Sequence, residues 1–335
     1  MDRSRITKPR QDNSMFLNHG LSLVLLICFL ITSCTESSPP TLRLGTNVWP
    51  GYEPLYLARH TGKLNTERVQ LVELSSSTQV MQAFRNDLID AAALTLDEVL
   101  QLHDTGEALQ VVLIMDTSHG ADAIVAQASI HSLGDLVGKK IGVESNALGA
   151  YVISRALNSV SLARTSIEII QLDIDHQETE FLRHSVAAVV TFEPLLSKLL
   201  MAGGHVVFDT SQIPNEIIDV LAVRTAYLER HPNVIQELIN AWFESTSLIG
   251  TEPHQTAEIL GQRMGLGVED TLAAYAGLKI PDRAENQKLL KGQPQPELAH
   301  TIAKISKVML EQKLIKNSVD PSALLGGTAL YYEKN

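Results

Sequence analysis

Cysteine, aromatic residues and charged residues are all scarce in this sequence of 335 residues. It contains 2 cysteines, 5% aromatic residues and 19% charged residues, against about 25% charged residues in an ordinary globular chain. Apolar residues make up 44% of the chain, which is enough to form a core and excludes an intrinsically disordered polymer. The net charge of −11 disfavours contact with a phosphate backbone, so we expect no nucleic-acid partner.

The motifs of several enzyme classes are also missing. The sequence has no G-x-G-x-x-G, no Walker-type lysine loop, no H-E-x-x-H and no Cys/His cluster, so it predicts neither a nucleotide cofactor nor a metal site. Ser118, His119 and Asp122 include the residue types of a hydrolase, but they are too close in sequence to form the required relay. We therefore expect a protein that is not an enzyme and that carries no cofactor.

A short apolar run near the N-terminus follows a basic segment. The first fifteen residues contain four basic residues, and the run from Leu21 to Ile31 is nearly all apolar but too short to cross about 30 Å of hydrocarbon. With the small residues before Cys34, this is the pattern of a secretory signal, so we expect residues 1–33 to be removed. The tetrapeptide Ile-Thr-Ser-Cys that ends at Cys34 is similar to a bacterial lipobox, which implies that Cys34 is lipidated. An ordinary signal peptide with a chance cysteine is the alternative.

The expected mature chain differs from the full chain in charge and in cysteine content. Removal of four basic and two acidic residues leaves 302 residues with a net charge of −13. Cys34 is then the only cysteine, which favours a lipid over a disulfide, and residues 34–40 resemble a short flexible tether. Translation from Met15 instead would leave the apolar run without a preceding basic segment. A single core stops growing at about 250–300 residues, so we expect two lobes.

From Thr41 onward, short apolar runs alternate with helical patterns, which is typical of an α/β fold with mostly parallel strands. Strands are predicted at 41–46, 69–74, 90–93, 110–115, 123–126, 140–143, 167–171, 187–191, 206–208 and 218–223. Helices are predicted at 54–61, 78–86, 96–105, 147–157, 178–183, 193–202, 232–249, 253–264, 268–276 and 296–313. No strand is predicted beyond Ala226.

Four strand-to-helix junctions carry hydroxyl or amide residues. Ser76 and Thr95 fit the first position of a capping box, Asn146 follows a further predicted strand, and Thr191 stands at the end of another. Open α/β sheets bind ligands at the carboxyl ends of parallel strands, where helix N-termini also offer free N–H groups. One N-cap needs no ligand, but four of them at one sheet edge favour a binding cleft.

The segment RLGTNVWPGYEPLYLAR at 43–59 resembles the opening of one group of ABC-transporter substrate-binding proteins, the nitrate/sulfonate/taurine/thiamine-precursor family. Four further stretches resemble this family and follow in its order: DAAALT at 90–95, DTSHGADA at 116–123, LVGKKIGVE at 136–144 and TFEP at 191–194. The resemblance extends over roughly residues 41–250. It rests on the five stretches occurring in the family's order after a lipobox, and not on any one of them.

This resemblance implies a two-lobe periplasmic-binding-protein fold with two interlobe crossovers and a helical C-terminal segment. Lobe 1 would comprise 41–118 plus 220–335 and lobe 2 would comprise 119–219, with crossovers near 115–122 and 209–219. A solute would bind between the lobes, and hinge closure would present it to a membrane permease. The implied protein is a periplasmic, lipid-anchored monomer that delivers a small polar solute to an ABC importer. The alternative is a lipoprotein that senses a ligand and signals to a membrane receptor.

Family position marks candidate residues for contact with the solute. They are Trp49, Ser75, Ser76, Ser77, Thr95, Ser118, Asn146 and Thr191. Further candidates flank these positions as aromatic walls or neighbouring acids: Tyr52, Asp116, Asp122, Glu144, Phe192 and Glu193.

Acidic residues surround the predicted cleft, and basic residues do not. Glu53, Asp97 and Glu98 add to the acids just named, whereas Lys139 and Lys140 precede their strand and so belong at its opposite end. A small oxyanion held by charge usually recruits arginine, so the pattern favours a neutral, zwitterionic or amine-bearing solute. The alternative is that acids in first helical turns only complement the helix dipole.

Overall fold

The computed structural model describes residues 40–292 and 295–326, together with Met1 and Thr7. The lipidation candidate Cys34 and the expected signal segment, apart from Met1 and Thr7, lie outside the described residues, as does the tether apart from Pro40. Within the described ranges, no helix combines the length and the apolar character that a membrane span requires.

A six-stranded sheet organises the first part of the fold, with the strand order β11-β4-β10-β3-β1-β2. Along the chain its strands are β1 (Leu42–Thr46), β2 (Val69–Glu73), β3 (Ala91–Thr95), β4 (Leu109–Ser118), β10 (Ile218–Arg224) and β11 (Leu278–Lys279). β1 pairs parallel with β2 and β3, whereas β10 runs antiparallel to β3 and β4. β3 is buried along its whole length, as expected for a continuous apolar run in a sheet covered on both faces.

A second sheet has five strands in the order β7-β6-β8-β5-β9. They are β5 (Asp122–Ala126), β6 (Lys140–Val143), β7 (Glu168–Gln171), β8 (Ala188–Phe192) and β9 (His205–Asp209). β6 pairs parallel with β7 and β8, whereas β5 runs antiparallel to β8 and β9.

Two direct links join the sheets. Only residues 119–121 separate β4 from β5, and residues 210–217 lead back from β9 to β10. Gly120 in the first link has a φ of +121°, a conformation that glycine adopts at little cost. Thr210 ties the links together, because its hydroxyl lies 2.7 Å from the Ser118 hydroxyl and accepts the Gly120 N–H at 2.8 Å.

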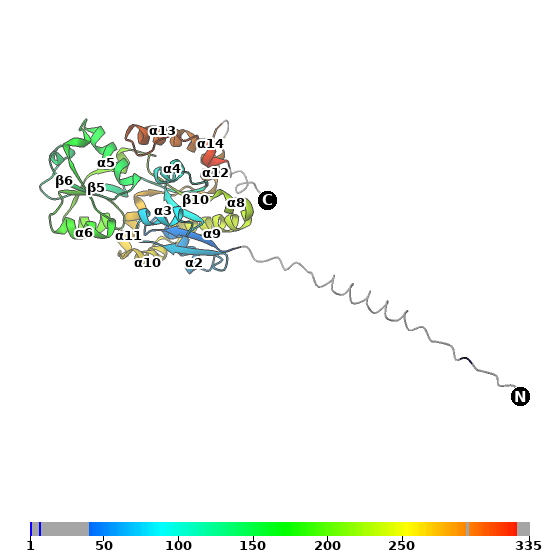
Figure 1. Ribbon diagram of the computed structural model, residues 1–335. Helices are drawn as coiled ribbons and strands as arrows, with labels where there is room; N and C mark the ends of the chain where they lie inside the picture. The colour runs from blue at the N-terminus through cyan, green and yellow to red at the C-terminus, as the bar shows by residue number, and fades with distance from the viewer. Residues whose placement is uncertain (2–6, 8–39, 293–294, 327–335) are drawn as a thin grey trace. The chain divides into compact units, whose positions relative to one another are not determined.

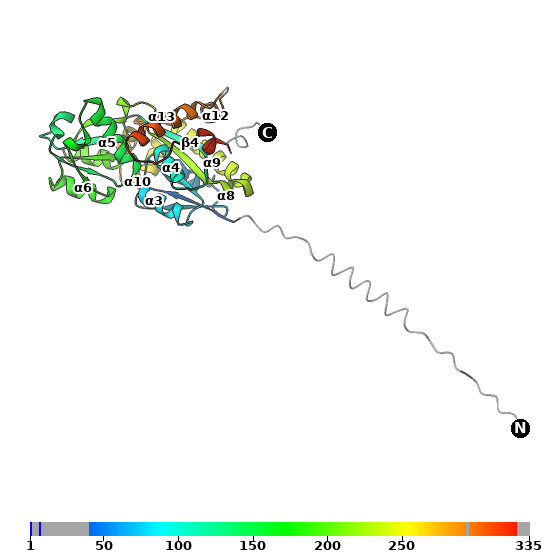
Figure 2. The ribbon, with the colours of Figure 1, turned by 45° about the horizontal axis from the view of Figure 1, so that its top comes forward.

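Helices cover both sheets (Figures 1 and 2). We call the first sheet and the helices that pack with it lobe 1. These helices are α2 (Glu53–His60), α3 (Ser77–Arg85), α4 (Leu96–Asp104), α8 (Thr225–Arg230), α9 (Pro232–Thr251), α10 (Pro253–Met264), α11 (Val268–Ala276), α12 (Arg283–Lys291), α13 (Glu297–Glu311) and α14 (Pro321–Leu325). With the second sheet, lobe 2, belong α5 (Ala147–Ser159), α6 (Ile174–Leu182) and α7 (Leu195–Met201). Both views show α5 and α6 on opposite faces of the second sheet.

The predicted α/β class is confirmed, but the prediction of mostly parallel strands is wrong. In the described part of the chain, four strand pairs are parallel and five are antiparallel. The reason is topological: β5 and β10 enter their sheets from the other lobe and run against their neighbours. The prediction of no strand beyond Ala226 is also wrong, because β11 pairs with β4. Two residues are too few to show a periodic pattern.

Candidate binding cleft

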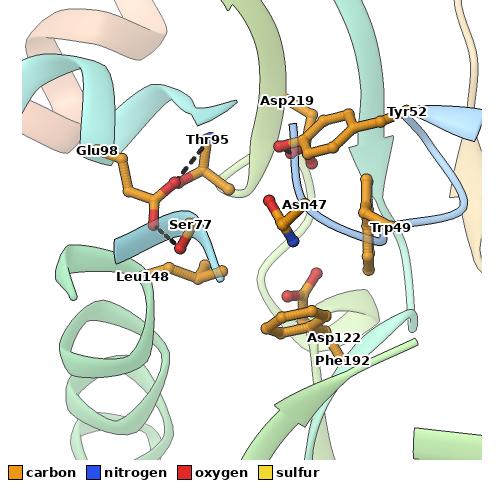
Figure 3. Close-up of a pocket in the computed structure, with 10 residues that line it drawn as sticks. All are labelled: Asn47, Trp49, Tyr52, Ser77, Thr95, Glu98, Asp122, Leu148, Phe192 and Asp219. Atoms are coloured by element: carbon orange, nitrogen blue, oxygen red, sulfur yellow. Dashed lines mark hydrogen bonds between the residues drawn. The ribbon is translucent and has the colours of Figure 1, made fainter. Parts of the chain in front are cut away.

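A cavity between the two lobes brings ten side chains together (Figure 3). The space in it that is open to the centre of a water-sized sphere is about 20 Å³, room for about one water molecule, so a solute of several atoms can enter only when the lobes move apart. Lobe 2 contributes Asp122, Leu148 and Phe192. Lobe 1 contributes Asn47, Trp49, Tyr52, Ser77, Thr95, Glu98 and Asp219.

Trp49 forms an aromatic wall of the cavity and is held from two sides. Its ring meets Phe192 of lobe 2 edge to face, with the ring centroids 5.8 Å apart, a favourable geometry for an aromatic pair. Its indole N–H donates to Asp116 Oδ2 at 3.1 Å. Gly51 permits this arrangement, because a Cβ at position 51 would lie 1.8 Å from the same Asp116 oxygen.

A pair of buried carboxyl groups lies beside this wall. Asp116 on β4 and Asp219 on β10 are direct partners in the strand register, and both are at most 2% exposed. Burial raises the pKa of Asp116 to about 7, and burial together with Asp116 raises the pKa of Asp219 well above its usual value. Tyr52 donates its hydroxyl hydrogen to Asp219. Two like charges this close favour retention of a proton between them.

Asp122 places a third carboxyl group on the lobe 2 side. It opens β5, is 3% exposed and points into the cavity (Figure 3). Among the described residues, its Oδ2 atom has no hydrogen-bond partner. Burial raises the pKa of Asp122 to about 7, a hydrogen bond with Ser118 lowers it in part, and the charges of Glu98 and Glu193 raise it further.

Glu98 lies where the two lobes touch. Its Oε1 atom accepts hydrogen bonds from the Ser77 hydroxyl at 2.6 Å and from the Asn146 amide at 3.2 Å, and its Oε2 atom accepts the Thr95 N–H at 3.2 Å. Burial and the neighbouring Asp97 raise the pKa of Glu98 to about 7, while its hydrogen bonds oppose that shift. Because Asn146 belongs to lobe 2, this contact holds the lobes together across the cleft.

A second contact across the cleft lies beside the first. The Thr78 hydroxyl donates to Glu144 Oε1 at 3.0 Å, and burial raises the pKa of Glu144 to about 7. Asn146 also donates to the Ser77 hydroxyl at 2.9 Å and caps α5 by accepting the Gly149 N–H at 2.8 Å. The lobes are therefore in direct contact around the cavity.

The structure gathers several sequence-predicted residues at the cavity. Trp49, Ser77 and Thr95 line it, as do Tyr52, Asp122 and Phe192.

Other predicted residues lie close to the cavity without lining it. Ser75 lines an adjoining hollow, Ser76 caps α3 by accepting the Gln79 N–H, and Asn146 binds Ser77 and Glu98 as described. Asp116 receives the indole N–H of Trp49. These residues support the lining from behind or beside it.

The remaining predicted residues have other partners. Ser118 bonds to Thr210 at the crossover, Glu144 to Thr78, and Glu193 accepts the N–H and the hydroxyl of Ser197.

The prediction that Thr191 is an N-cap is wrong. β8 continues through Phe192, which pairs with Asp122, so Thr191 lies inside the strand and is 1% exposed. The N-cap of α7 is Pro194, which has no side-chain capping bond. The physical reason is that Thr191 and Phe192 both pair with β5, so β8 keeps Thr191 as in the predicted strand at 187–191 and runs one residue further, and no helix begins there.

Four lining residues escaped the sequence prediction of the site: Asn47, Glu98, Leu148 and Asp219. A signal for Asp219 was present, because it is an acid inside the apolar strand Ile-Asp-Val-Leu-Ala-Val. Glu98 was recognised only as an acid beside the cleft and a capping partner of Thr95. Asn47 and Leu148 carry no pattern that separates them from ordinary loop and helix residues.

None of the ten lining residues is basic. Lys198 and Arg263 line the adjoining hollow at Ser75, but Arg263 donates to Glu53 Oε2 at 2.6 Å and also pairs with Glu73. Glu53, expected beside the cleft, is thus neutralised by Arg263. The acids that line the cavity have no such partner among the described residues.

The comparisons with known proteins agree with this architecture. A family model described as the NMT1-like family matches residues 35–263. The chain belongs to the NMT1-like family. A protein of Escherichia coli (strain K12) named as an aliphatic sulfonates-binding protein is 24% identical over 252 residues, which are 73% of this chain and 78% of the relative. The taurine-binding periplasmic protein of the same strain is 21% identical over 210 residues, 61% of this chain and 62% of the relative.

Solved structures of this kind share the fold. The alkanesulfonate-binding protein SsuA from Xanthomonas axonopodis pv. citri, bound to MOPS, superposes with a TM-score of 0.74 at 18% identity, covering 86% of this chain and 99% of that one. The nitrate-binding protein NrtA from Synechocystis PCC 6803 superposes with a TM-score of 0.58 at 14% identity, covering 70% and 69%. The predicted two-lobe periplasmic-binding-protein fold and the family resemblance are confirmed.

Proposed function

We propose that this protein captures a small, amine-bearing organic cation in the interlobe cavity and delivers it to an ABC importer. Its family and relatives make it a solute-binding protein and not an enzyme. The relatives named above bind sulfonates and taurine, whereas the chemistry of this cavity differs from what an anion needs. The charge of the solute is therefore the point on which this chain departs from those relatives.

The observation that carries the proposal is the set of buried carboxyl groups without a basic counterpart. Asp122, Asp219 and Glu98 reach the cavity from three sides and are each at most 3% exposed. Burying an unpaired charge costs several kcal/mol, and Asp122 Oδ2 has no partner among the described residues. A bound ammonium group would supply the missing charge and the missing hydrogen-bond donor together.

An anionic head group would meet the opposite situation. It would lie against the carboxylates of Asp122 and Glu98 and against the Asp116–Asp219 pair, which keeps a proton, with no lysine or arginine in the lining. One like-charge pair 4 Å apart costs about 4 kcal/mol at an effective dielectric constant of about 20. The cavity therefore selects against sulfonates and nitrate.

The aromatic side chains suit the same solute. Trp49, Tyr52 and Phe192 all line the cavity, and aromatic faces attract cations by about 0.5–2 kcal/mol each. Leu148 adds an apolar surface on the lobe 2 side. An organic cation with a few carbon atoms would use both kinds of surface, which a metal ion would not.

A thermal-shift panel tests this proposal. Small primary amines and quaternary ammonium ions are compared with taurine, methanesulfonate and nitrate at pH 8, because a ligand that binds only the folded protein raises the melting temperature. We expect at least one amine to raise it, and Asp122→Asn to abolish the effect. Asp87→Asn is the matched control, because it removes the same charge from a side chain that is 83% exposed. A shift with sulfonates but with no amine would overturn the proposal.

We further propose the export and anchoring that the N-terminal sequence predicts. Residues 1–33 would be removed and Cys34 would carry a lipid, which holds the monomeric protein outside the cytoplasm near its permease. The periplasmic relative supports this location. The lobe boundaries of 41–118 plus 220–335 and 119–219 belong to the same proposal. Cys34→Ala should move the protein from the membrane fraction to the soluble fraction, and an unchanged distribution would count against the anchor.

A further inference from the structure

Glu98 has more hydrogen-bond donors than a helix cap requires. The capping bond from the Thr95 N–H uses only its Oε2 atom. Its Oε1 atom accepts from Ser77 and Asn146, which come from two other helices and from both lobes. Glu98 is 0% exposed, and its carboxylate accepts hydrogen bonds from three donors while it lines the cavity.

Three helix N-termini meet at this carboxylate. Ser77 is the first residue of α3, Thr95 is the N-cap of α4, and Asn146 is the N-cap of α5. A helix N-terminus carries a partial positive charge and attracts anions. The donors and the helix ends together have the composition of an oxyanion site, and the chain's own carboxylate fills it.

We propose that Glu98 is an internal anion that occupies this oxyanion site and thereby determines the charge selectivity of the cleft. With Glu98 in place, no donor of the set is free for an external anion, and the carboxylate adds to the negative wall of the cavity. Without it, Ser77, Asn146 and the Thr95 N–H would face a vacated space of carboxylate size. The inference deepens the proposed cation-binding function by assigning the exclusion of anions to one residue.

Chemical rescue tests this inference. Glu98→Ala removes the carboxylate and leaves the donors, so acetate and methanesulfonate are titrated into it by calorimetry at pH 8. We expect both anions to bind Glu98→Ala at least tenfold more tightly than they bind the unmodified protein. Glu98→Gln is the first control, because its amide fills the same space and should not gain anion binding. Glu144→Ala is the second, because it removes another buried cleft carboxylate, one that accepts from the Thr78 hydroxyl and is not shared by three helix N-termini.

Each outcome of this experiment decides the inference. Should Glu98→Ala unfold in plain buffer, refolding in 100 mM acetate or methanesulfonate is expected, since either anion replaces the lost acceptor. The inference is overturned if folded Glu98→Ala binds neither anion, or if neither anion refolds an unfolded Glu98→Ala. It is also overturned if Glu144→Ala gains as much anion affinity as Glu98→Ala. The readout needs no cation, so failure of the amine panel and failure of this inference are distinguishable.

Discussion

Replacing Asp122 by asparagine should make the ligand-free protein more stable at pH 8 while it abolishes binding. The substitution keeps the shape of the side chain but removes a charge that is 3% exposed and without a partner at Oδ2 among the described residues. The folded protein then no longer bears the free-energy cost of an ionised side chain buried at this position. A gain in stability with a loss of function is what a binding carboxylate predicts, whereas a structural carboxylate predicts a loss of both.

The magnitude follows from the pKa of Asp122. Burial raises it from 3.8 to about 7, and each unit corresponds to about 1.4 kcal/mol. Between these two values the folded protein binds more protons than the unfolded chain, so stability falls as the pH rises and the full penalty is present above pH 7. The penalty is about 4 kcal/mol at pH 8 and below about 2 kcal/mol at pH 5. Asp122→Asn removes it, so its advantage should grow with pH.

Urea unfolding at pH 5 and pH 8 measures this difference. We expect Asp122→Asn to exceed the unmodified protein by a few kcal/mol at pH 8 and by much less at pH 5. Asp87→Asn, at a side chain that is 83% exposed, should change stability little at either pH. A less stable Asp122→Asn variant, or a gain of equal size at both pH values, would refute the reasoning.

Three further changes test other parts of the cleft. Gly51→Ala should destabilise the protein by roughly 1–3 kcal/mol because its Cβ would overlap Asp116. Gly250→Ala is the control and should not destabilise it, because a Cβ there has nothing within 4 Å. Thermal unfolding compares the stabilities of the two variants. Trp49→Phe should weaken amine binding about fivefold, as expected for loss of about 1 kcal/mol of cation–π attraction, and calorimetry measures it; unchanged affinity would exclude the ring from the site. Glu216→Gln should cost roughly 3 kcal/mol at pH 7, because that carboxylate receives bonds from both lobes. Its pKa is lowered, so this loss should disappear in acid, below the native pKa, and a pH-independent loss would argue against the ion pairs.

The fold was largely predictable because its local patterns are strong. Ten strands of the structure correspond to predicted apolar runs, and the helix at Pro253–Met264 has the predicted bounds. Strand direction was not predictable in the same way. It depends on β5 and β10 crossing between sheets, and a local sequence pattern carries no information on the lobe from which a strand arrives.

The hydrogen-bond donors of the candidate site could be predicted from the sequence, whereas the carboxyl groups that accept from them could not. Hydroxyl and amide residues at strand ends marked Ser76, Thr95 and Asn146, because N-caps have a recognisable spacing, and the family resemblance marked Ser77. The partner that takes up these donors, Glu98, is 21 residues from Ser77 and 48 from Asn146 in sequence. Only the packing of three helix ends against one another shows that Glu98 occupies the site that these donors form. Asp219 likewise reaches the cavity only through the antiparallel pairing of its strand with Asp116.

The solute that accompanies the protein through a mild purification tests the central claim most directly. Native mass spectrometry of the intact complex at pH 8, followed by denaturation and identification of the released molecule, gives its mass and its charge. The buried carboxyl groups of Asp122, Asp219 and Glu98 predict a small amine-bearing cation whose affinity falls as the pH drops below about 7, the pKa of Asp122 in the ligand-free cleft. A bound sulfonate, nitrate or other oxyanion would contradict the account.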